Sequence, residues 1–208
     1  MEKAEKMRYN GGQEAIRVVN VLVIYGSPRA KSDSAALARA LLEQRPADAA
    51  VKEYNAYRMN ARPCLGCGGC DRQIGCVQRD LDGFYRDFEA ADYVVFASPV
   101  YNGGFPAPLK AILDRFQCYY ALRFAHRVKP PIEKHRRAAL VLTGGCEAEG
   151  GEQMTAALRQ QCTVLNAELT AVVTVTGTDK RALSQADFAE AREAGAVLFR
   201  EEGEKENA

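Results

Sequence analysis

Four nearly continuous apolar runs, rich in β-branched residues, constrain the fold of this chain more than any other feature. They cover residues 18–25, 93–97, 138–142 and 169–175, and a weaker run at 50–54 has the composition of an edge strand. Runs in which apolar residues do not alternate with polar ones are typical of strands buried on both faces of a parallel sheet. The sequence therefore predicts four buried strands and one edge strand.

Helical patterns occupy the four connections between these runs and the segment after the last one. The clearest pattern, in residues 109–116, places apolar side chains at i, i+3, i+4 and i+7. The last helix is expected to start at Ser184, with Asp187 three residues on, as in a capping box. Weaker patterns cover residues 36–41, 84–88 and 154–162. Alternating strands and helices predict an α/β fold, and five parallel strands match the flavodoxin-like three-layer sandwich with strand order 2-1-3-4-5.

Composition narrows the class of protein. The net charge of +1 gives no field that favours nucleic acid or an anionic membrane. No segment has the length of a membrane span or the pattern of a signal peptide. We expect a cytoplasmic protein with a flexible leader over residues 1–15 and a single domain over residues 16–208, with a Cys-rich loop at 60–82. Structural disulfides are rare in that compartment.

Ligands of such sheets bind beyond the carboxyl ends of the strands. The first loop there, GSPRAKSDS at residues 26–34, leads from a strand into a helix. Hydroxyls, backbone N–H groups and Arg29 favour a phosphate at the helix N-terminus. The loop lacks the glycines of a dinucleotide fingerprint or a Walker A motif, so a mononucleotide fits better. An ordinary helix cap with solvated serines remains the alternative.

Two further loops follow the third and fourth predicted strands. Residues 98–110 contain two glycines and three prolines, and this irregular backbone can present polar groups to a planar ring that Tyr101 would cover. Residues 143–151 contain four glycines, which allow close approach of a ligand to the backbone. Taken alone, either loop is also compatible with a plain connection. Together with the first loop, they predict a site for a mononucleotide with a planar ring at one sheet edge.

The segment CLGCGGCDRQIGC, residues 64–76, holds four of the seven cysteines. A cubane iron–sulfur cluster needs four thiolates around one small object, and the interspersed glycines allow the turns. Zinc is less natural because structural zinc sites pair two knuckles across a longer gap. Cluster-free thiols that pack or oxidise are the other alternative. The remaining cysteines, Cys118, Cys146 and Cys162, are not expected to be ligands, and the two histidines, His126 and His135, are expected to be solvated.

The chain resembles the NADPH-dependent FMN reductase branch of the flavodoxin-like superfamily. The resemblance rests on GSPRAKSDS, on ADYVVFASPVYNGGFPAPLKAILDR and on the TGG after the fourth run, and it covers roughly residues 17–200. It implies that the first loop binds the FMN phosphate through Ser27, Arg29, Ser32, Asp33 and Ser34. The second loop would contact the isoalloxazine ring through Pro99, Val100, Tyr101, Asn102 and Gly103. The third would close over the flavin through Thr143, Gly144 and Gly145. The resemblance implies no catalytic side chain, because the flavin carries the chemistry.

The cysteine spacing is similar to that of the iron–sulfur flavoproteins in the same superfamily. This similarity implies a [4Fe–4S] cluster on Cys64, Cys67, Cys70 and Cys76, next to FMN and usually across a dimer interface. The implied function is an NAD(P)H oxidoreductase that passes electrons between reduced nicotinamide or a ferredoxin-like carrier, FMN and an acceptor, as a homodimer or homotetramer. A cluster-free reductase of quinones, nitro compounds or free flavin is the alternative, and a flavin-binding redox sensor is the third.

Overall fold

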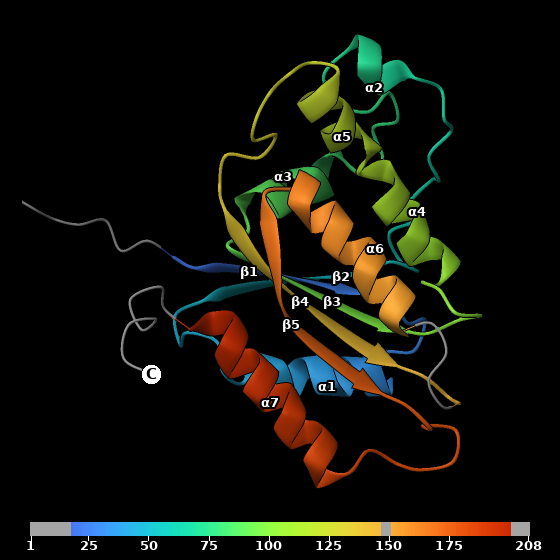
Figure 1. Ribbon diagram of the computed structural model, residues 1–208, viewed down its shortest axis with the longest axis vertical. Coiled ribbons are helices and arrows are strands. Elements are labelled where there is room, and N and C mark those ends of the chain that lie inside the picture. Colours follow the sequence, from blue (N-terminus) through green and yellow to red (C-terminus); the bar gives the residue numbers. More distant parts are fainter. Residues whose placement is uncertain (1–17, 147–150, 201–208) are drawn as a thin grey trace, which may run out of the picture.

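A single five-stranded parallel sheet with the order β2-β1-β3-β4-β5 runs through the molecule (Figure 1). The computed structural model describes residues 18–146 and 151–200, so the predicted leader over residues 1–15 lies outside the described part. The strands are β1 (Asn20–Tyr25), β2 (Ala50–Asn55), β3 (Tyr93–Pro99), β4 (Arg136–Thr143) and β5 (Ala167–Val175). The predicted strands and the flavodoxin-like order are confirmed, but the prediction of a single edge strand was wrong, because β5 is the second edge and its residues alternate between buried and more exposed positions.

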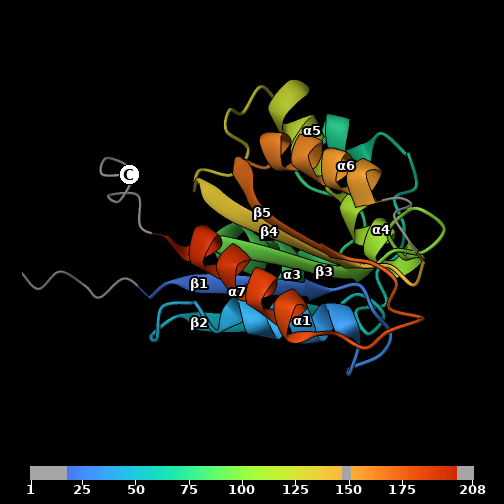
Figure 2. The ribbon, with the colours of Figure 1, turned by 60° about the horizontal axis from the view of Figure 1, so that its bottom comes forward.

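Helices cover both faces of this sheet. α1 (Asp33–Leu42) and α7 (Gln185–Phe199) lie together on one face, and α3 (Asp82–Ala90), α4 (Ala107–Arg115) and α6 (Gly151–Val164) lie on the other (Figures 1 and 2). The strands supply alternate residues to the two cores: Leu22 and Ile24 pack toward α3 and α4, whereas Val21 and Val23 pack toward α1. The unbroken apolar runs therefore reflect burial of both faces.

Two short helices were not predicted from the sequence. α2 (Gly69–Arg72) lies within the Cys-rich loop, and α5 (Gln117–Phe124) follows α4 directly. The sequence analysis predicted no helix between residue 116 and the fourth strand, but Cys118, Tyr119 and Ala121 are buried, so tertiary packing gives α5 its inner face. The two helices pack against each other beside α4 (Figure 1). No helix in the described ranges is long and apolar enough to cross a membrane.

A buried arginine holds α6 in place over β4. Arg136, at the start of β4, is 1% exposed and donates to the Phe88 carbonyl in the last turn of α3, at 2.8 Å, and to the Leu165 carbonyl just after α6. Its guanidinium also stacks on the Phe88 ring, 4.4 Å from the centroid. Burial lowers the pKa of Arg136 to about 10, so it remains charged at neutral pH. The cation thus meets the negative ends of two helices.

Candidate functional site

The loops after β1, β3 and β4 lie side by side at one edge of the sheet. A hydrogen bond one step past each strand holds them: Gly26 N–H donates to Ala97 O at 2.7 Å, Val100 N–H to Thr143 O at 2.8 Å, and Gly144 N–H to Val175 O at 2.9 Å. The parallel ladder therefore continues into the loops. The three segments that the sequence analysis singled out meet where a ligand of this fold is expected.

The first of these loops has the form of an anion site. Ser32 is the N-cap of α1 and accepts from the Ala35 N–H at 3.3 Å, and its Oγ lies 3.3 Å from Ser34 Oγ. Ser27 and Ser34 are each 1% exposed, whereas Arg29 is exposed. Two buried hydroxyls, the N-terminus of a ten-residue helix and a nearby guanidinium suit a phosphate group.

Gly26 is required where β1 enters this loop. A Cβ built there would lie 2.7 Å from Leu109 Cδ2 and 2.9 Å from Ser98 Oγ. The side chain of Asn55, at the end of β2, donates to the Ser27 carbonyl at 2.8 Å and fixes the next residue. The loop is therefore held close to β3 and α4, and larger residues at Gly26 would displace it.

The second loop turns tightly after β3. Tyr101 and Gly104 exchange two backbone hydrogen bonds, of 2.9 and 3.0 Å, around Asn102 and Gly103. Both central residues have positive φ, 51° and 73°, as a two-residue hairpin turn requires. Tyr101 is 41% exposed. The turn projects from the sheet edge with an aromatic ring available to cover a planar ligand.

The third loop is braced by the loop that follows β5. The Gly144 carbonyl accepts from the Thr178 N–H and from its hydroxyl, both at 3.1 Å, and the Gly145 carbonyl accepts from the Asp179 N–H at 3.2 Å. A Cβ at Gly145 would lie 2.2 Å from an Asp179 carboxylate oxygen, so any other residue here would displace the Asp179 side chain. Residues 147–150 of this loop lie outside the described part of the chain.

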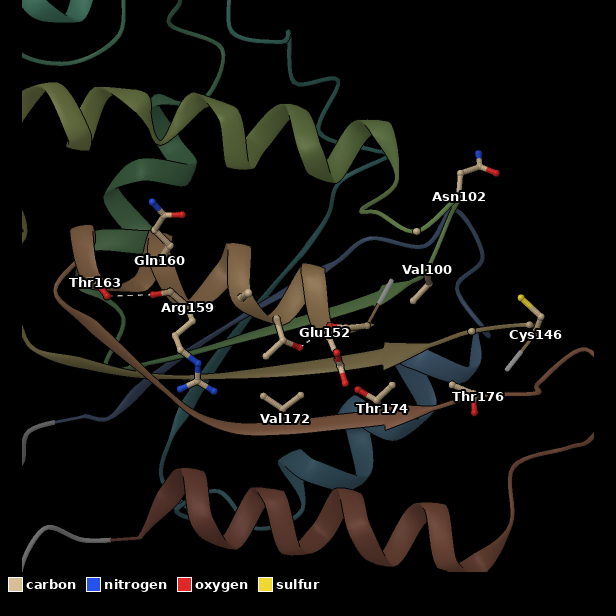
Figure 3. A pocket seen from close by; sticks show the side chains of 16 residues that line it. Val100, Asn102, Cys146, Glu152, Arg159, Gln160, Thr163, Val172, Thr174 and Thr176 are labelled. Carbon is tan, nitrogen blue, oxygen red and sulfur yellow. Dashed lines mark hydrogen bonds between the residues drawn. The ribbon is translucent and has the colours of Figure 1, made fainter. Parts of the chain in front are cut away.

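A cavity of about 1060 Å³ opens from the second and third loops and extends along α6 and β5 (Figure 3). Of the residues predicted to bind flavin, it is lined by Val100, Asn102, Gly103, Gly144 and Gly145. The phosphate-loop residues, Pro99, Tyr101 and Thr143 do not line it. The arrangement therefore suits a ligand with a phosphate at α1 and a planar ring at one end of the cavity.

The sequence analysis missed the far side of this cavity. That side consists of one polar stripe of α6 and the face of β5 opposite it: Glu152, Thr155, Ala156, Arg159, Gln160 and Thr163 from the helix, with Val172, Thr174 and Thr176 from the strand and beyond. The stripe recurs at helical spacing, which was the available signal. Only apolar stripes were used to find helices, so a polar stripe facing a strand went unnoticed. Cys146, at the edge of the cavity, is exposed.

Hydrogen bonds and an ion pair join the two ends of the Cys-rich loop. Arg115, 1% exposed at the end of α4, donates to the carbonyls of Arg62 and Gln78, both at 2.9 Å, and to the Asp80 carboxylate at 3.1 Å. Gln78 donates to the Pro63 carbonyl at 2.9 Å, and the Arg62 N–H donates to Asp80 at 2.9 Å. The two ends of the loop are therefore tied to each other and to one buried guanidinium.

All four motif cysteines line one pocket of about 440 Å³ inside this loop. The buried Cys118, on α5, lines the same pocket, although it lies 42 residues beyond Cys76 in the sequence. His126 Nε2 lies 2.8 Å from the Cys70 carbonyl oxygen, so the expectation of a fully solvated histidine was wrong there, whereas His135 is exposed. The fold thus adds a thiol and an imidazole to the cysteine segment.

Burial and hydrogen bonds shift the pKa values of groups in and beside this pocket. Burial raises the pKa of Cys70, and it raises the pKa of Cys118 to about 12. Burial alone would also raise the pKa of Asp80, but hydrogen bonds from the Arg62 N–H and the Arg115 guanidinium outweigh it and hold that pKa below its ordinary value. The base of the loop is therefore an ion pair, and burial favours the neutral thiol at Cys70 and Cys118.

A [4Fe–4S] cluster and a single metal ion require different arrangements of the ligand atoms in this pocket. In the described ranges, no three His, Cys, Asp or Glu side chains converge on a point where one ion would bind. A [4Fe–4S] cluster is larger, and its four thiolates surround a volume. The pocket is lined by five cysteines, and all seven cysteines of the chain are free thiols, so no disulfide occupies it.

The cysteine pocket and the flavin loops lie at opposite ends of α4. Asp114 and Arg115, at the C-terminal end of this helix, line the cysteine pocket, whereas the turn at Asn102 precedes its N-terminal end. Nine residues of α-helix rise about 13 Å. The resemblance implied a cluster next to FMN, but within a single chain the cysteines do not lie beside the flavin loops, because their loop runs from β2 to the far end of α4.

A family model and individual relatives both match this chain. Residues 19–178 match the family described as NADPH-dependent FMN reductase. An iron–sulfur flavoprotein of Methanosarcina thermophila is 37% identical over 94 residues, which is 45% of each chain. One of Methanocaldococcus jannaschii is 28% identical over 138 residues, 65% of this chain and 66% of the relative. The matched part thus spans about half to two thirds of these relatives.

Solved structures share the fold at low sequence identity. An NAD(P)H:quinone oxidoreductase from Methanothermobacter marburgensis superposes with a TM-score of 0.69 at 20% identity, covering 89% of this chain and 98% of the other. An azoreductase from Bacillus anthracis gives 0.61 at 19% identity, with 88% and 99% covered. Likeness at this level of identity establishes the architecture.

Proposed function

The chain belongs to the NADPH-dependent FMN reductase family, and on that premise we propose that it is an FMN-dependent NAD(P)H oxidoreductase of the iron–sulfur flavoprotein type. The observation that carries the proposal is the meeting of three ligand loops at one sheet edge, with a phosphate cradle at α1 and a ring-sized end of the cavity at Val100 and Gly144. The names of the aligned relatives support the iron–sulfur part.

In this proposal the flavin supplies the redox chemistry by taking up a hydride and releasing its electrons in one or two steps. The chain binds and orients it. Ser27, Ser32 and Ser34 hold the phosphate through hydroxyls, while Arg29 supplies charge. The hairpin turn at Asn102 and the glycines at 144–145 enclose the ring from two sides, and Tyr101 limits water at its exposed edge.

In this proposal Cys64, Cys67, Cys70 and Cys76 of the closed loop would hold a [4Fe–4S] cluster, which would supply one-electron exchange with a ferredoxin-like carrier. Because α4 separates the cysteine pocket from the flavin loops in one chain, the two groups would be brought together at an interface between two copies, in a homodimer or homotetramer. A cytoplasmic location and a single domain over residues 16–208 belong to the same proposal.

The alternative is a cluster-free NAD(P)H reductase of quinones, nitro compounds or flavin. The distance between cysteine pocket and flavin loops favours it, because a reductase of small acceptors needs only the cavity beside the ring. In that case the thiols, Cys118 included, pack or respond to oxidation.

Absorption spectra with iron and sulfide assays, on protein purified without oxygen, separate the two. We expect flavin bands over a broad charge-transfer background and about four irons per chain, as a cubane requires. The Cys67→Ser/Cys70→Ser double variant should lose the iron and keep the FMN, because the flavin loops contain neither residue.

Two matched variants make this test specific. Cys162→Ala removes a buried thiol of α6 that does not line the cysteine pocket, so iron content should not change. Cys118→Ala removes the fifth thiol of the pocket and should also retain the iron, because Cys118 is not a proposed ligand. Unchanged iron in the double variant would sink the cluster assignment, and absence of FMN from the wild-type protein would sink the whole proposal.

A further inference from the structure

One buried hydrogen-bond donor at the base of the Cys-rich loop has no acceptor. Arg115 is buried at the end of α4. Its two Nη atoms donate to the carbonyls of Arg62 and Gln78 and to the Asp80 carboxylate. Its Nε–H, which is also buried, meets no acceptor among the described residues. Such donors are rare in native proteins because leaving them unpaired is costly, so an acceptor from outside the chain is expected here.

A second buried arginine shows what is particular about this donor. Arg136 Nε also lacks an acceptor among the described residues, but its guanidinium lies on the Phe88 ring in the core. Arg115 instead lines the cysteine pocket, together with Cys76 and Cys118. The unpaired donor therefore belongs to a side chain on the wall of a pocket that five thiols share.

The charged groups on this wall are few. Among the described residues that line the pocket, Arg115 is the only cation. Two carboxylates, those of Asp71 and Asp114, also line it, and Asp114 is paired with Lys110. A negatively charged group in the pocket would thus find its one cationic partner in the Arg115 guanidinium.

The surroundings of Arg115 keep it charged and leave positive charge available. Burial alone would lower its pKa, but Tyr85, Asp80 and Cys76 outweigh burial and raise it. The Arg62 guanidinium lies 3.6 Å from the same Asp80 carboxylate that Arg115 contacts at 3.1 Å. Two cations therefore share one carboxylate, and the ion pair with Asp80 does not cancel the charge at the base of the loop.

We infer that the Arg115 Nε–H donates to a sulfur of the iron–sulfur cluster and raises its reduction potential. The inference rests on the proposed function, in which the four motif cysteines hold that cluster. Its thiolates and sulfides are hydrogen-bond acceptors, and hydrogen bonds to them set its potential. Reduction adds negative charge to these sulfurs, so the charge-assisted hydrogen bond stabilises the reduced state more than the oxidised one.

The test measures the reduction potential of the cluster by EPR-monitored redox titration of protein purified without oxygen. Arg115→Lys retains the charge and loses the donor at the Nε position. At a fixed solution potential it should lower the ratio of reduced to oxidised cluster about tenfold, which is a fall of about 59 mV for one electron. Asp80→Asn keeps the donor and removes a negative charge, so it should raise the potential. A merely structural role predicts shifts in the same direction, because both variants loosen the same loop.

A second measurement works on the wild-type chain. Arginine labelled with a heavy nitrogen isotope should show a hyperfine coupling to the reduced cluster in electron–nuclear double resonance. Arg72→Lys is the matched control, because the exposed Arg72 donates to the Cys67 carbonyl at 3.3 Å. The coupling should remain in Arg72→Lys and disappear in Arg115→Lys. If Arg115→Lys binds no iron, the wild type and Arg72→Lys decide the matter alone.

Three results would overturn the inference while leaving iron content and FMN binding intact. They are an unchanged potential in Arg115→Lys, shifts in the same direction in Arg115→Lys and Asp80→Asn, and absence of the arginine coupling from the wild type or from Arg72→Lys. A wild-type chain without iron would instead overturn the cluster assignment of the proposed function, and this inference with it.

Discussion

At the scale of single residues, the start of α7 shows how a local sequence signal becomes an ion-pair cluster. The Ser184 hydroxyl accepts from the Asp187 N–H at 3.3 Å, and the Asp187 carboxylate accepts from the Ser184 N–H at 2.7 Å. Arg181 adds a two-pronged contact to the same carboxylate, at 2.6 and 2.9 Å. The predicted capping box is confirmed, and the fold adds the cation.

This cluster makes stability depend on acid pH. The Arg181 guanidinium and the Ser184 donors hold the pKa of Asp187 well below its ordinary value of about 3.9. The carboxylate therefore stabilises the fold above that pH and ceases to do so as pH falls toward the lowered pKa. We expect Asp187→Asn to lose about 1–2 kcal/mol at pH 7 and to depend less on pH between about 5 and 2 than the wild type. Urea unfolding at several pH values measures the free energy of unfolding of both proteins. The prediction would be contradicted if that free energy changed with pH in the same way in the variant and in the wild type.

At the scale of elements, α7 approaches α1 so closely that one position admits no side chain. A Cβ at Gly195 would lie 2.3 Å from the Leu41 carbonyl oxygen, a backbone atom that cannot move aside. Ala191 and Leu198 pack on either side, in the same core as Leu37. Glycine in the middle of a helix is unfavourable in itself. Here the close packing of α7 against α1 requires glycine at position 195.

Two helical glycines should therefore respond oppositely to alanine. Gly195→Ala forces α7 away from α1 and should lower the free energy of unfolding by about 1–3 kcal/mol. Gly83→Ala, on α3, meets only the end of the Arg86 side chain at 3.9 Å and should raise it by about 0.5–1 kcal/mol. Denaturant unfolding of both variants decides the matter. Stabilisation by Gly195→Ala would show that the α1–α7 contact is looser than the structure indicates.

At the scale of the whole molecule, the two proposed redox sites lie at opposite ends of α4. The surface around the cysteine pocket exposes four large apolar side chains: Leu65 and Ile74 are 66% and 70% exposed, and Tyr120 and Phe124 of the adjoining α5 are 48% and 51% exposed. Exposed apolar groups of this size are typical of interaction surfaces. We expect the proposed interface between two copies to include this surface.

Multi-angle light scattering tests this arrangement. We expect the FMN-loaded chain to be a dimer or tetramer, and Ile74→Glu to weaken the assembly while leaving FMN bound, because Ile74 lies far from the flavin loops. A monomer with full iron content that exchanges electrons between flavin and cluster would contradict transfer across an interface.

The sequence by itself determined the strands and the three loops that follow them, because burial of the strands and the turn chemistry of glycine and proline are local properties. The strand order came from the match of five parallel strands to a known sheet type. The sequence also located the motif cysteines and the cap at Ser184. Short elements such as α5 escaped prediction, since their helical form depends on what they pack against.

Only the tertiary structure decided what meets across long stretches of chain. Arg115 closes a loop whose ends lie 53 and 35 residues away, Cys118 joins the motif cysteines, and a polar stripe of α6 faces β5 to make the cavity. The local periodicity of the sequence does not predict such contacts. They arise when helices are packed on the sheet and side chains are turned toward partners that the sequence alone does not name.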